Sequence, residues 1–445
     1  MGLLVFLVSL CIFSLTINGV TSTDHTTSFV QLGYAVLYNH TLALGDVGTF
    51  HPDSVDDLAY HGKYYSALAP GTVFLALPFL AVGFAMAGGY SIFGYVLLAS
   101  GGFMSLVAAL ATYVVFKLGT LYFRRPTSVF VSAAFAFSTT AWPFAGWLFQ
   151  SDLSALLVVT SAYFSVLAGR AEAAWKLSAL SGIALAVAVT IDYVNLELIP
   201  IVSLFLLMSG EGKSLKVRSA VAFAMTSALG PVLVGYYDYL LFGNPFTTTE
   251  QVYLGAGTIF SSFSYPILDG LALNLVSPVR GLFLFAPVAI LGALGYLVAL
   301  RLTGLRREIL LMIAMLFAIL LAYSAWYGPT GGLAFGPRYL VTVIPFAVLP
   351  AGFAIEKWGR PADLAAYGLY IAGVAMNGMA AITTAIPSEL SWWSSPYLGT
   401  ILPSFVGGQA SAWWWGSAYG YGPVFGVIIL FLAGLMPAML SKNSG

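Results

Sequence analysis

The sequence predicts an all-α, polytopic membrane protein with about twelve transmembrane helices. Three observations support this fold class: 60% of the 445 residues are hydrophobic, only 8% are charged, and the mean hydropathy is +0.91. A soluble chain of this length needs a far more polar surface, so the composition indicates that lipid surrounds the protein. The formal net charge is zero, which gives no bulk electrostatic attraction toward nucleic acid.

Thirteen apolar runs are candidates for membrane-spanning segments. They cover residues 3–19, 72–88, 92–116, 127–141, 153–169, 175–191, 195–209, 219–237, 281–300, 308–325, 339–355, 364–386 and 421–440. The run 72–88 contains Pro78 and Gly83 and lies between Gly71 and the pair Gly88-Gly89, which makes it the weaker spanning helix. We therefore interpret 72–88 as an interfacial or re-entrant helix and the other runs as twelve spans.

The basic residues predict the orientation in the membrane. Twelve spans with a cytoplasmic N-terminus place 14 of the 17 Lys and Arg residues on the cytoplasmic side, as the positive-inside rule expects. The predicted organisation is a single transmembrane domain over residues 1–445, with a first extracytoplasmic loop at 21–91 and an aromatic-rich outer loop at 386–420. We expect an integral protein of the plasma membrane whose working site faces outside.

The first outer loop concentrates polar side chains that can carry chemistry. All four histidines of the chain and five aspartates fall between residues 24 and 61. Asp24 follows the first helix directly, and an ionised group at the membrane boundary needs a partner or a function. It is a helix-end aspartate solvated by headgroup water, the N-cap of a helix over 26–38, or a general base or metal ligand with His25 beside it. A divalent metal remains an open alternative with His25, His61 and Asp53 as candidate ligands, although no spacing here is diagnostic.

Three outer basic residues indicate an anionic ligand. Lys63 stands in the run His-Gly-Lys-Tyr-Tyr, Arg280 in Ser-Pro-Val-Arg-Gly, and Arg338 in Gly-Pro-Arg-Tyr. Proline and glycine beside a cation fix its backbone, and a guanidinium presents a planar fork that suits phosphate or carboxylate. The alternative is that these side chains extend to lipid headgroups. We expect Tyr65 and Tyr339 to share the ligand site with them.

Other features of the outer side are less specific. Asp152 is a candidate second catalytic carboxylate, whereas Asp192 and Asp238 fit better as simple partners of the outer arginines. Eight of the ten tryptophans fall on the outer side, where they form an interfacial belt or stack on sugar rings. Motifs for phosphate-binding loops, dinucleotide folds and zinc peptidases do not occur in a usable context.

Taken together, these motifs resemble the polytopic GT-C-type glycosyltransferases that use polyprenyl-phosphate-linked sugars. The resemblance is closest to the prokaryotic branch related to protein mannosyltransferases and aminoarabinose transferases, and it covers roughly residues 1–350. The resembling segments are Asp24, Gly62–Gly71, Phe242–Phe246, Ser277–Phe283 and Phe335–Leu340.

The resemblance implies specific roles. In such enzymes a first-loop acid acts as the base or organises the acceptor, outer basic residues hold the lipid phosphate, and the first loop forms juxtamembrane helices. This chain departs from the pattern at two places. Ala67 and Leu68 stand where relatives often carry a lysine shortly before the proline, with Lys63 one helical turn earlier, and His25 follows Asp24 where relatives have an Asp-Glu pair.

The sequence therefore predicts a membrane glycosyltransferase that moves a sugar from a polyprenyl-phosphate donor to a protein, lipid or glycan acceptor, with no nucleic-acid partner. Two other functions stay open. A multi-span transporter or lipid flippase normally places ionisable groups near the bilayer midplane and shows internal symmetry, neither of which is evident. A non-catalytic scaffold with a transferase-like fold would tolerate substitution of Asp24 and Arg338.

Overall fold

The computed structural model describes residues 1–19, 22–50, 52–171, 174–209, 213–255, 258–328, 330–383 and 395–409. The helices of the first part of the chain are α1 (Gly2–Leu15), α2 (Asp24–Tyr34), η1 (Ala35–Asn39), α3 (Gly71–Ala87), α4 (Tyr95–Gly119), α5 (Arg125–Phe137), α6 (Ala141–Phe144) and α7 (Gln150–Arg170). The middle part contains α8 (Ala174–Ile191), η2 (Tyr193–Glu197), α9 (Leu198–Met208), α10 (Lys213–Ser227), α11 (Leu229–Phe242), α12 (Thr249–Leu254), η3 (Ile259–Ser262) and α13 (Ile267–Val276). The last part contains α14 (Leu282–Phe285), α15 (Val288–Ala299), η4 (Thr303–Leu305), α16 (Arg306–Ala325), η5 (Arg338–Val343), α17 (Ile344–Val348), α18 (Ala351–Trp358), α19 (Arg360–Ile382), η6 (Tyr397–Ile401) and α20 (Leu402–Val406).

The predicted polytopic helical membrane fold is confirmed. Within the described residues, 7 helical segments are long and apolar enough to cross a membrane. They are Tyr95–Gly119, Gln150–Arg170, Ala174–Ile191, Lys216–Phe242, Thr303–Ala325, Arg338–Trp358 and Arg360–Ile382. Shorter apolar helices stand at other predicted runs, among them α1, α3 and α15. The run 281–300 is split into α14 and α15 at Pro287, and 421–440 lies outside the described residues.

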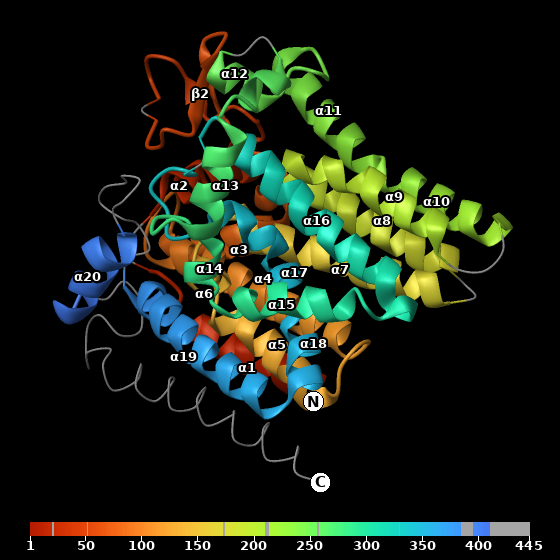
Figure 1. Cartoon of the computed structure of the whole chain (residues 1–445). Coiled ribbons are helices and arrows are strands. Elements are labelled where there is room, and N and C mark those ends of the chain that lie inside the picture. The colour runs from red at the N-terminus through yellow and green to blue at the C-terminus, as the bar shows by residue number, and fades with distance from the viewer. Residues whose placement is uncertain are drawn as a thin grey trace.

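The first loop contains a small sheet that the sequence analysis does not predict. Strands β1 (Gly45–Asp46), β2 (Asp57–Tyr60) and β3 (Lys63–Ser66) form an antiparallel sheet in the order β1-β3-β2. The hairpin between β2 and β3 turns at His61 and Gly62, both with positive φ, as a tight hairpin turn requires. Figure 1 shows β2 next to α12 at one end of the helical body.

Helices α2, α3 and α4 hold this loop on the helical body. Phe29 of α2, Leu80 and Phe84 of α3, and Val96 of α4 are buried in one apolar cluster. The opposite face of α3 exposes large apolar side chains such as Met86. An apolar helix with one face in a protein core and one face exposed is suited to a lipid environment. Whether α3 crosses the bilayer, as opposed to lying at its surface, stays a prediction.

The aromatic-rich segment predicted at 386–420 is described only over residues 395–409, which form η6 and α20. Tyr397 at the start of η6 directs its hydroxyl at the Met379 sulfur of α19, 3.6 Å away. This part of the segment therefore packs against the end of α19.

Close helix contacts in the body depend on glycine. A Cβ at Gly292 of α15 would overlap the carbonyl oxygen of Ala347, and a Cβ at Gly295 would overlap that of Pro350. The absence of side chains at these two positions lets α15 lie directly against α17 and α18.

Replacing Gly295 with alanine should therefore destabilise the protein, by about 1–3 kcal/mol or more in the free energy of unfolding. Gly368 in α19 is the matched control, because a Cβ there meets nothing within 4 Å. Thermal unfolding of both variants in the same detergent tests this. Equal Tm values for Gly295→Ala and Gly368→Ala would contradict the packing described here.

Candidate active site

The start of α2 places Asp24 and His25 at the end of the helical body where the sheet lies. Thr23 is the helix cap, since its hydroxyl accepts a hydrogen bond from the Thr26 amide at 3.1 Å. Asp24 is thus the first helical residue, and the alternative that Asp24 caps the helix is wrong. The Asp24 carbonyl accepts a hydrogen bond from the Ser54 hydroxyl at 2.9 Å, while its carboxylate remains exposed.

His25 contacts an acid that the sequence analysis does not single out. Its Nδ1 lies 2.6 Å from Oδ2 of Asp56, which precedes β2. The imidazole stacks on the Phe149 ring, with centroids 4.9 Å apart and planes inclined by 13°. Burial lowers the pKa of His25, and the positive charge of Arg338 lowers it further, against the opposing effect of Asp56. Because Nδ1 faces the Asp56 carboxylate, the neutral ring is best placed with its proton on Nδ1, which leaves Nε2 as the acceptor.

The sheet explains how Asp56 reaches His25. Ser28 of α2 and Ser66 of β3 are joined through their hydroxyls at 2.8 Å, and Ser66 pairs with Asp57 in the β2–β3 register. This contact fixes the sheet against α2 and holds the residue before β2 at the first turn of the helix.

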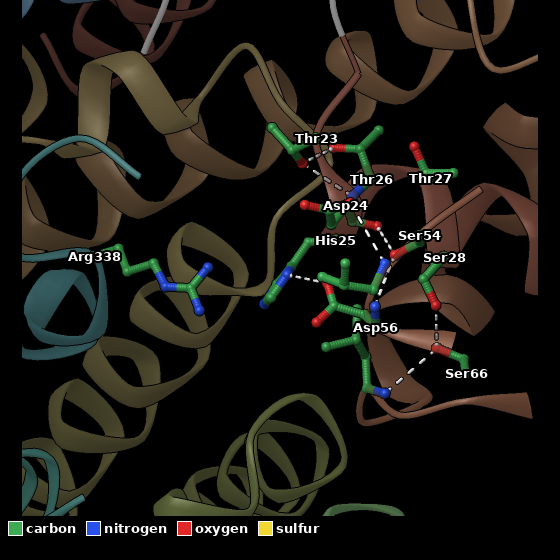
Figure 2. A network of polar contacts seen from close by, with 12 residues as sticks. Thr23, Asp24, His25, Thr26, Thr27, Ser28, Ser54, Asp56, Ser66 and Arg338 are labelled. Atoms are coloured by element: carbon green, nitrogen blue, oxygen red, sulfur yellow. Dashed lines mark hydrogen bonds and ion pairs between the residues drawn. The ribbon is translucent and has the colours of Figure 1, made fainter. Parts of the chain in front are cut away.

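Arg338 faces this pair from the start of η5. Figure 2 shows its side chain directed toward His25, with Asp56 on the other side of the imidazole. The Arg338 guanidinium carbon lies 5.6 Å from the centroid of Phe149 and 4.9 Å from that of Tyr339. A Cβ at Gly331 would collide with the Arg338 Nε, so this glycine allows the guanidinium to approach the loop.

The guanidinium of Arg338 has few polar partners. One Nη atom donates to the Tyr339 hydroxyl at a long 3.4 Å, and the buried Nε makes no hydrogen bond among the described residues. In the part of the chain that the structure describes, no carboxylate lies within 4 Å of it. A partly buried cation without a counter-ion is costly, which makes Arg338 the best-placed group for an anionic ligand.

Two tyrosine–carboxylate contacts extend the site away from the first loop. Tyr323 of α16 stacks on Tyr339, with centroids 4.2 Å apart and planes inclined by 2°, and its hydroxyl donates to the carboxylate of Asp192. Tyr327 donates to Glu250 of α12 at 3.3 Å, and burial raises the pKa of Glu250 to about 7. Asp192 thus pairs with a tyrosine where the sequence suggested an arginine.

Arg280 lies close to Arg338 but has a different environment. Its side chain is fully buried and donates to four carbonyl oxygens of the segment before Arg338. They belong to Thr330, Gly332, Ala334 and Gly336. The predicted phosphate-binding role of Arg280 remains a prediction, and these contacts show that the residue holds the loop that carries Arg338.

The predicted site residues Lys63, Tyr65 and Asp152 make their contacts away from Arg338. Lys63 is exposed beside the β2–β3 turn, and Tyr65 of β3 lies 6.5 Å from Phe242 between ring centroids. Asp152 is buried in the first turn of α7, and both its carboxylate oxygens lack a hydrogen-bond partner among the described residues. Within the same residues, no hydrogen bond or ion pair connects Lys63, Tyr65 or Asp152 to Arg338.

The candidate metal ligands do not converge. His25 pairs with Asp56, His61 stacks on Tyr60 at 4.0 Å between centroids, and Asp53 accepts a hydrogen bond from Tyr90 at 3.4 Å. Over the described ranges, no group of three His, Cys, Asp or Glu side chains is arranged to hold a metal ion. These residues as placed do not fit a metal site.

Two solved structures superpose on nearly the whole of this chain. The archaeal oligosaccharyltransferase AglB from Archaeoglobus fulgidus, in complex with an inhibitory peptide and a dolichol-phosphate, superposes with a TM-score of 0.57 at 12% identity over 99% of this chain. ArnT from Cupriavidus metallidurans, bound to undecaprenyl phosphate, gives a TM-score of 0.58 at 16% identity over 98% of this chain. The protein has the fold of GT-C-type glycosyltransferases.

The likeness is one of fold. This chain spans 56% of the AglB chain and 73% of the ArnT chain. In sequence, no protein-family profile and no curated protein matches it. The resemblance to GT-C-type transferases drawn from the sequence motifs is therefore supported at the level of the fold.

Substituting Arg280 should disrupt the site through the loop. Arg280→Lys keeps the charge but loses the planar fork, and Arg280→Met leaves four carbonyl oxygens without their donor. We expect the free energy of unfolding to fall by about 2–4 kcal/mol for methionine and by less for lysine. Limited proteolysis should cleave within residues 330–336 first. An unchanged Tm and unchanged cleavage for Arg280→Met would contradict the role assigned to these hydrogen bonds.

The first loop should also make stability depend on pH. Burial raises the pKa of Asp57 from 3.8 to about 7, so the folded state favours its protonated form. That stabilisation is complete below the ordinary pKa and is lost as the pH rises through about 7. Asp57→Asn should reduce the loss of stability between acidic and mildly alkaline pH by roughly 1–2 kcal/mol, allowing for solvent screening.

Thermal unfolding across this pH range measures the effect of Asp57→Asn. The Tm of the variant should still fall with rising pH, but less steeply than that of the wild type, because the pKa of Glu250 is also raised to about 7. Asp46→Asn, at an exposed first-loop acid, should keep the wild-type slope. Identical slopes in the wild type and Asp57→Asn would exclude Asp57 as the group responsible.

Proposed function

We propose that this integral membrane protein is a glycosyltransferase that moves a sugar from a polyprenyl-phosphate-linked donor to an acceptor on the extracytoplasmic side of the plasma membrane. The observation that carries the proposal is Arg338. Its guanidinium is partly buried among aromatic rings, has no carboxylate within 4 Å among the described residues, and points at the His25–Asp56 pair. A phosphate group is an anion whose geometry matches the guanidinium fork.

The donor phosphate would bind Arg338 throughout the reaction. As the bond between the sugar carbon and the phosphate oxygen breaks, negative charge grows on the leaving polyprenyl phosphate. A fixed guanidinium in surroundings of low polarity stabilises that charge without reorganising. Tyr339 supports the cation through its ring and its hydroxyl.

The first turn of α2 would receive the acceptor. Asp24 carries an exposed carboxylate beside His25, on the side of the site away from the loop that holds Arg338. There it can orient or deprotonate the acceptor hydroxyl, whose oxygen forms the new bond to the sugar carbon. When Asp24 acts as the base, its carboxylate takes the hydroxyl proton, and the electron pair of the broken bond leaves with the phosphate.

The structural relatives support the choice of donor. One of them was solved in complex with a dolichol-phosphate and another bound to undecaprenyl phosphate. Both ligands carry a phosphate on a polyprenyl chain, which a membrane-embedded enzyme can take up from the bilayer. A donor of this kind needs no nucleotide site. The sequence contains no phosphate-binding loop or dinucleotide-binding motif in a usable context.

The test is sugar transfer by the purified protein in membranes, from a panel of radiolabelled polyprenyl-phosphate sugars. Arg338→Gln should lower kcat by about 10²–10³-fold, because it removes a charge that acts on the leaving phosphate. Asp24→Asn should abolish transfer with the fold intact. Arg360→Gln and Asp46→Asn are the matched controls, since both residues are exposed and lie outside the site.

Two outcomes would overturn the proposal. Full activity of Asp24→Asn and Arg338→Gln with a transferring wild type would place the chemistry elsewhere. Absence of transfer from every donor, together with substrate-dependent uptake in sealed vesicles, would indicate a transporter. Tm measurements on each variant separate loss of chemistry from loss of folding.

A further inference from the structure

A second site candidate lies at the other end of the helical body. An open groove of about 830 Å³ runs between the first residues of α8 and one face of α10. Among the described residues, its lining comes from these two helices. They are Trp175, Ser214, Val217, Arg218, Val221, Ala222 and Met225. Figure 1 shows α8, α9 and α10 side by side at the edge of the protein, far from β2.

The groove is distant from the candidate active site. Trp175 stands in the first turn of α8, whereas Asp192, which contacts Tyr323, follows the last turn of the same helix. At a rise of 1.5 Å per residue, the two ends of α8 are about 25 Å apart. A ligand in the groove would therefore be separate from the proposed transfer reaction.

The lining changes from polar to apolar along α10. Ser214 and Arg218 lie in its first turns, and Val221 and Met225 follow one and two turns deeper. Residues four apart share a helix face, so Val217, Val221 and Met225 form one continuous row. These three side chains are exposed, at 46%, 49% and 71%. A charged end followed by an apolar wall is the polarity order of a phospholipid that enters a bilayer.

The polar end is positively charged and contains an interfacial aromatic. The Arg218 guanidinium carbon lies 4.9 Å from the Trp175 ring centroid, and the Lys176 ammonium lies 5.8 Å from it. Neither cation has a carboxylate within 4 Å among the described residues. Tryptophan fits the headgroup level of a bilayer, and each Lys or Arg near the surface attracts anionic lipid by about 1 kcal/mol.

Further basic residues mark this end of the protein. Arg170, at the end of α7, pairs with Glu308 at the start of α16, and Arg307 donates to the Met208 carbonyl at the end of α9 at 2.6 Å. These two cations have protein partners, whereas Arg218 lines the groove and Lys176 lies beside its Trp175 ring. The charge of the groove is therefore available to a ligand.

We infer that this groove is a binding site for an anionic glycerophospholipid, with the phosphate at Arg218 and Lys176 and an acyl chain along the row Val217, Val221 and Met225. The headgroup phosphate accepts hydrogen bonds from the guanidinium and from the Ser214 hydroxyl. Trp175 covers the glycerol region. The lipid joins the ends of α8 and α10 on the basic side of the membrane.

Native mass spectrometry of the full-length protein tests the site directly. The protein is purified in detergent and offered phosphatidylglycerol, phosphatidylethanolamine or undecaprenyl phosphate at equal concentration. We expect one phosphatidylglycerol to be retained about five- to tenfold better than phosphatidylethanolamine, and Arg218→Gln to abolish this preference. Arg301→Gln, at an exposed arginine after α15 that does not line the groove, should keep it.

Each remaining outcome contradicts the inference. Equal retention of phosphatidylglycerol and phosphatidylethanolamine, or an unchanged preference in Arg218→Gln, would mean that the cations only extend to bulk headgroups. Stronger retention of undecaprenyl phosphate would assign the groove to a polyprenyl carrier. Arg218 is exposed, so its variant should keep the wild-type Tm in lipid-free detergent and fold normally.

Discussion

The hydrogen bonds of the buried Arg280 guanidinium are the constraint on which the candidate site depends. Residues 330–336 have no regular structure, yet Ala334 and Gly336 are buried against an apolar core. Backbone carbonyls in such surroundings must have donors, since each orphaned group costs about 1–3 kcal/mol. Arg280 donates hydrogen bonds to four of these carbonyl oxygens. One side chain thus supplies the hydrogen bonds that backbone amides would supply in a helix or sheet. Residues 330–336 therefore hold Arg338 in a defined position facing His25.

The two arginines Arg280 and Arg338 differ in the environment of their guanidinium groups. Both stand next to proline or glycine at the start of apolar segments. Arg280 meets backbone carbonyls that satisfy its fork, whereas Arg338 meets the rings of Phe149 and Tyr339. Aromatic faces stabilise a cation without occupying its hydrogen-bond donors. Arg338 can therefore hold an anion, while Arg280 keeps the surrounding backbone in place.

The two ends of α8 have opposite character, and this polarity fits a protein that works across a bilayer. Carboxylates and tyrosines gather beyond its C-terminus, where Asp192 meets Tyr323 and Glu250 meets Tyr327. Its N-terminus carries Trp175 and lies beside basic side chains and an apolar groove. The acidic, aromatic end suits the handling of polar substrate groups, and the basic end suits contact with anionic lipid. The two ends of α8 therefore have surroundings of different charge and polarity.

The sequence by itself determined the fold class and pointed to Asp24, His25 and Arg338, because apolar runs must satisfy their backbone hydrogen bonds internally and isolated outer charges stand out against them. Only the tertiary structure decided which polar groups meet. Asp56 reaches His25 through a sheet of short strands, and Phe149 and Tyr323 are apolar or aromatic residues without a local signal. Within the described residues, the run 281–300 is divided into two helices at Pro287, since the effect of a proline on an apolar run depends on what packs beside it. Periodicity is a local property of the chain, whereas the partners of a side chain are set by contacts between segments far apart in sequence.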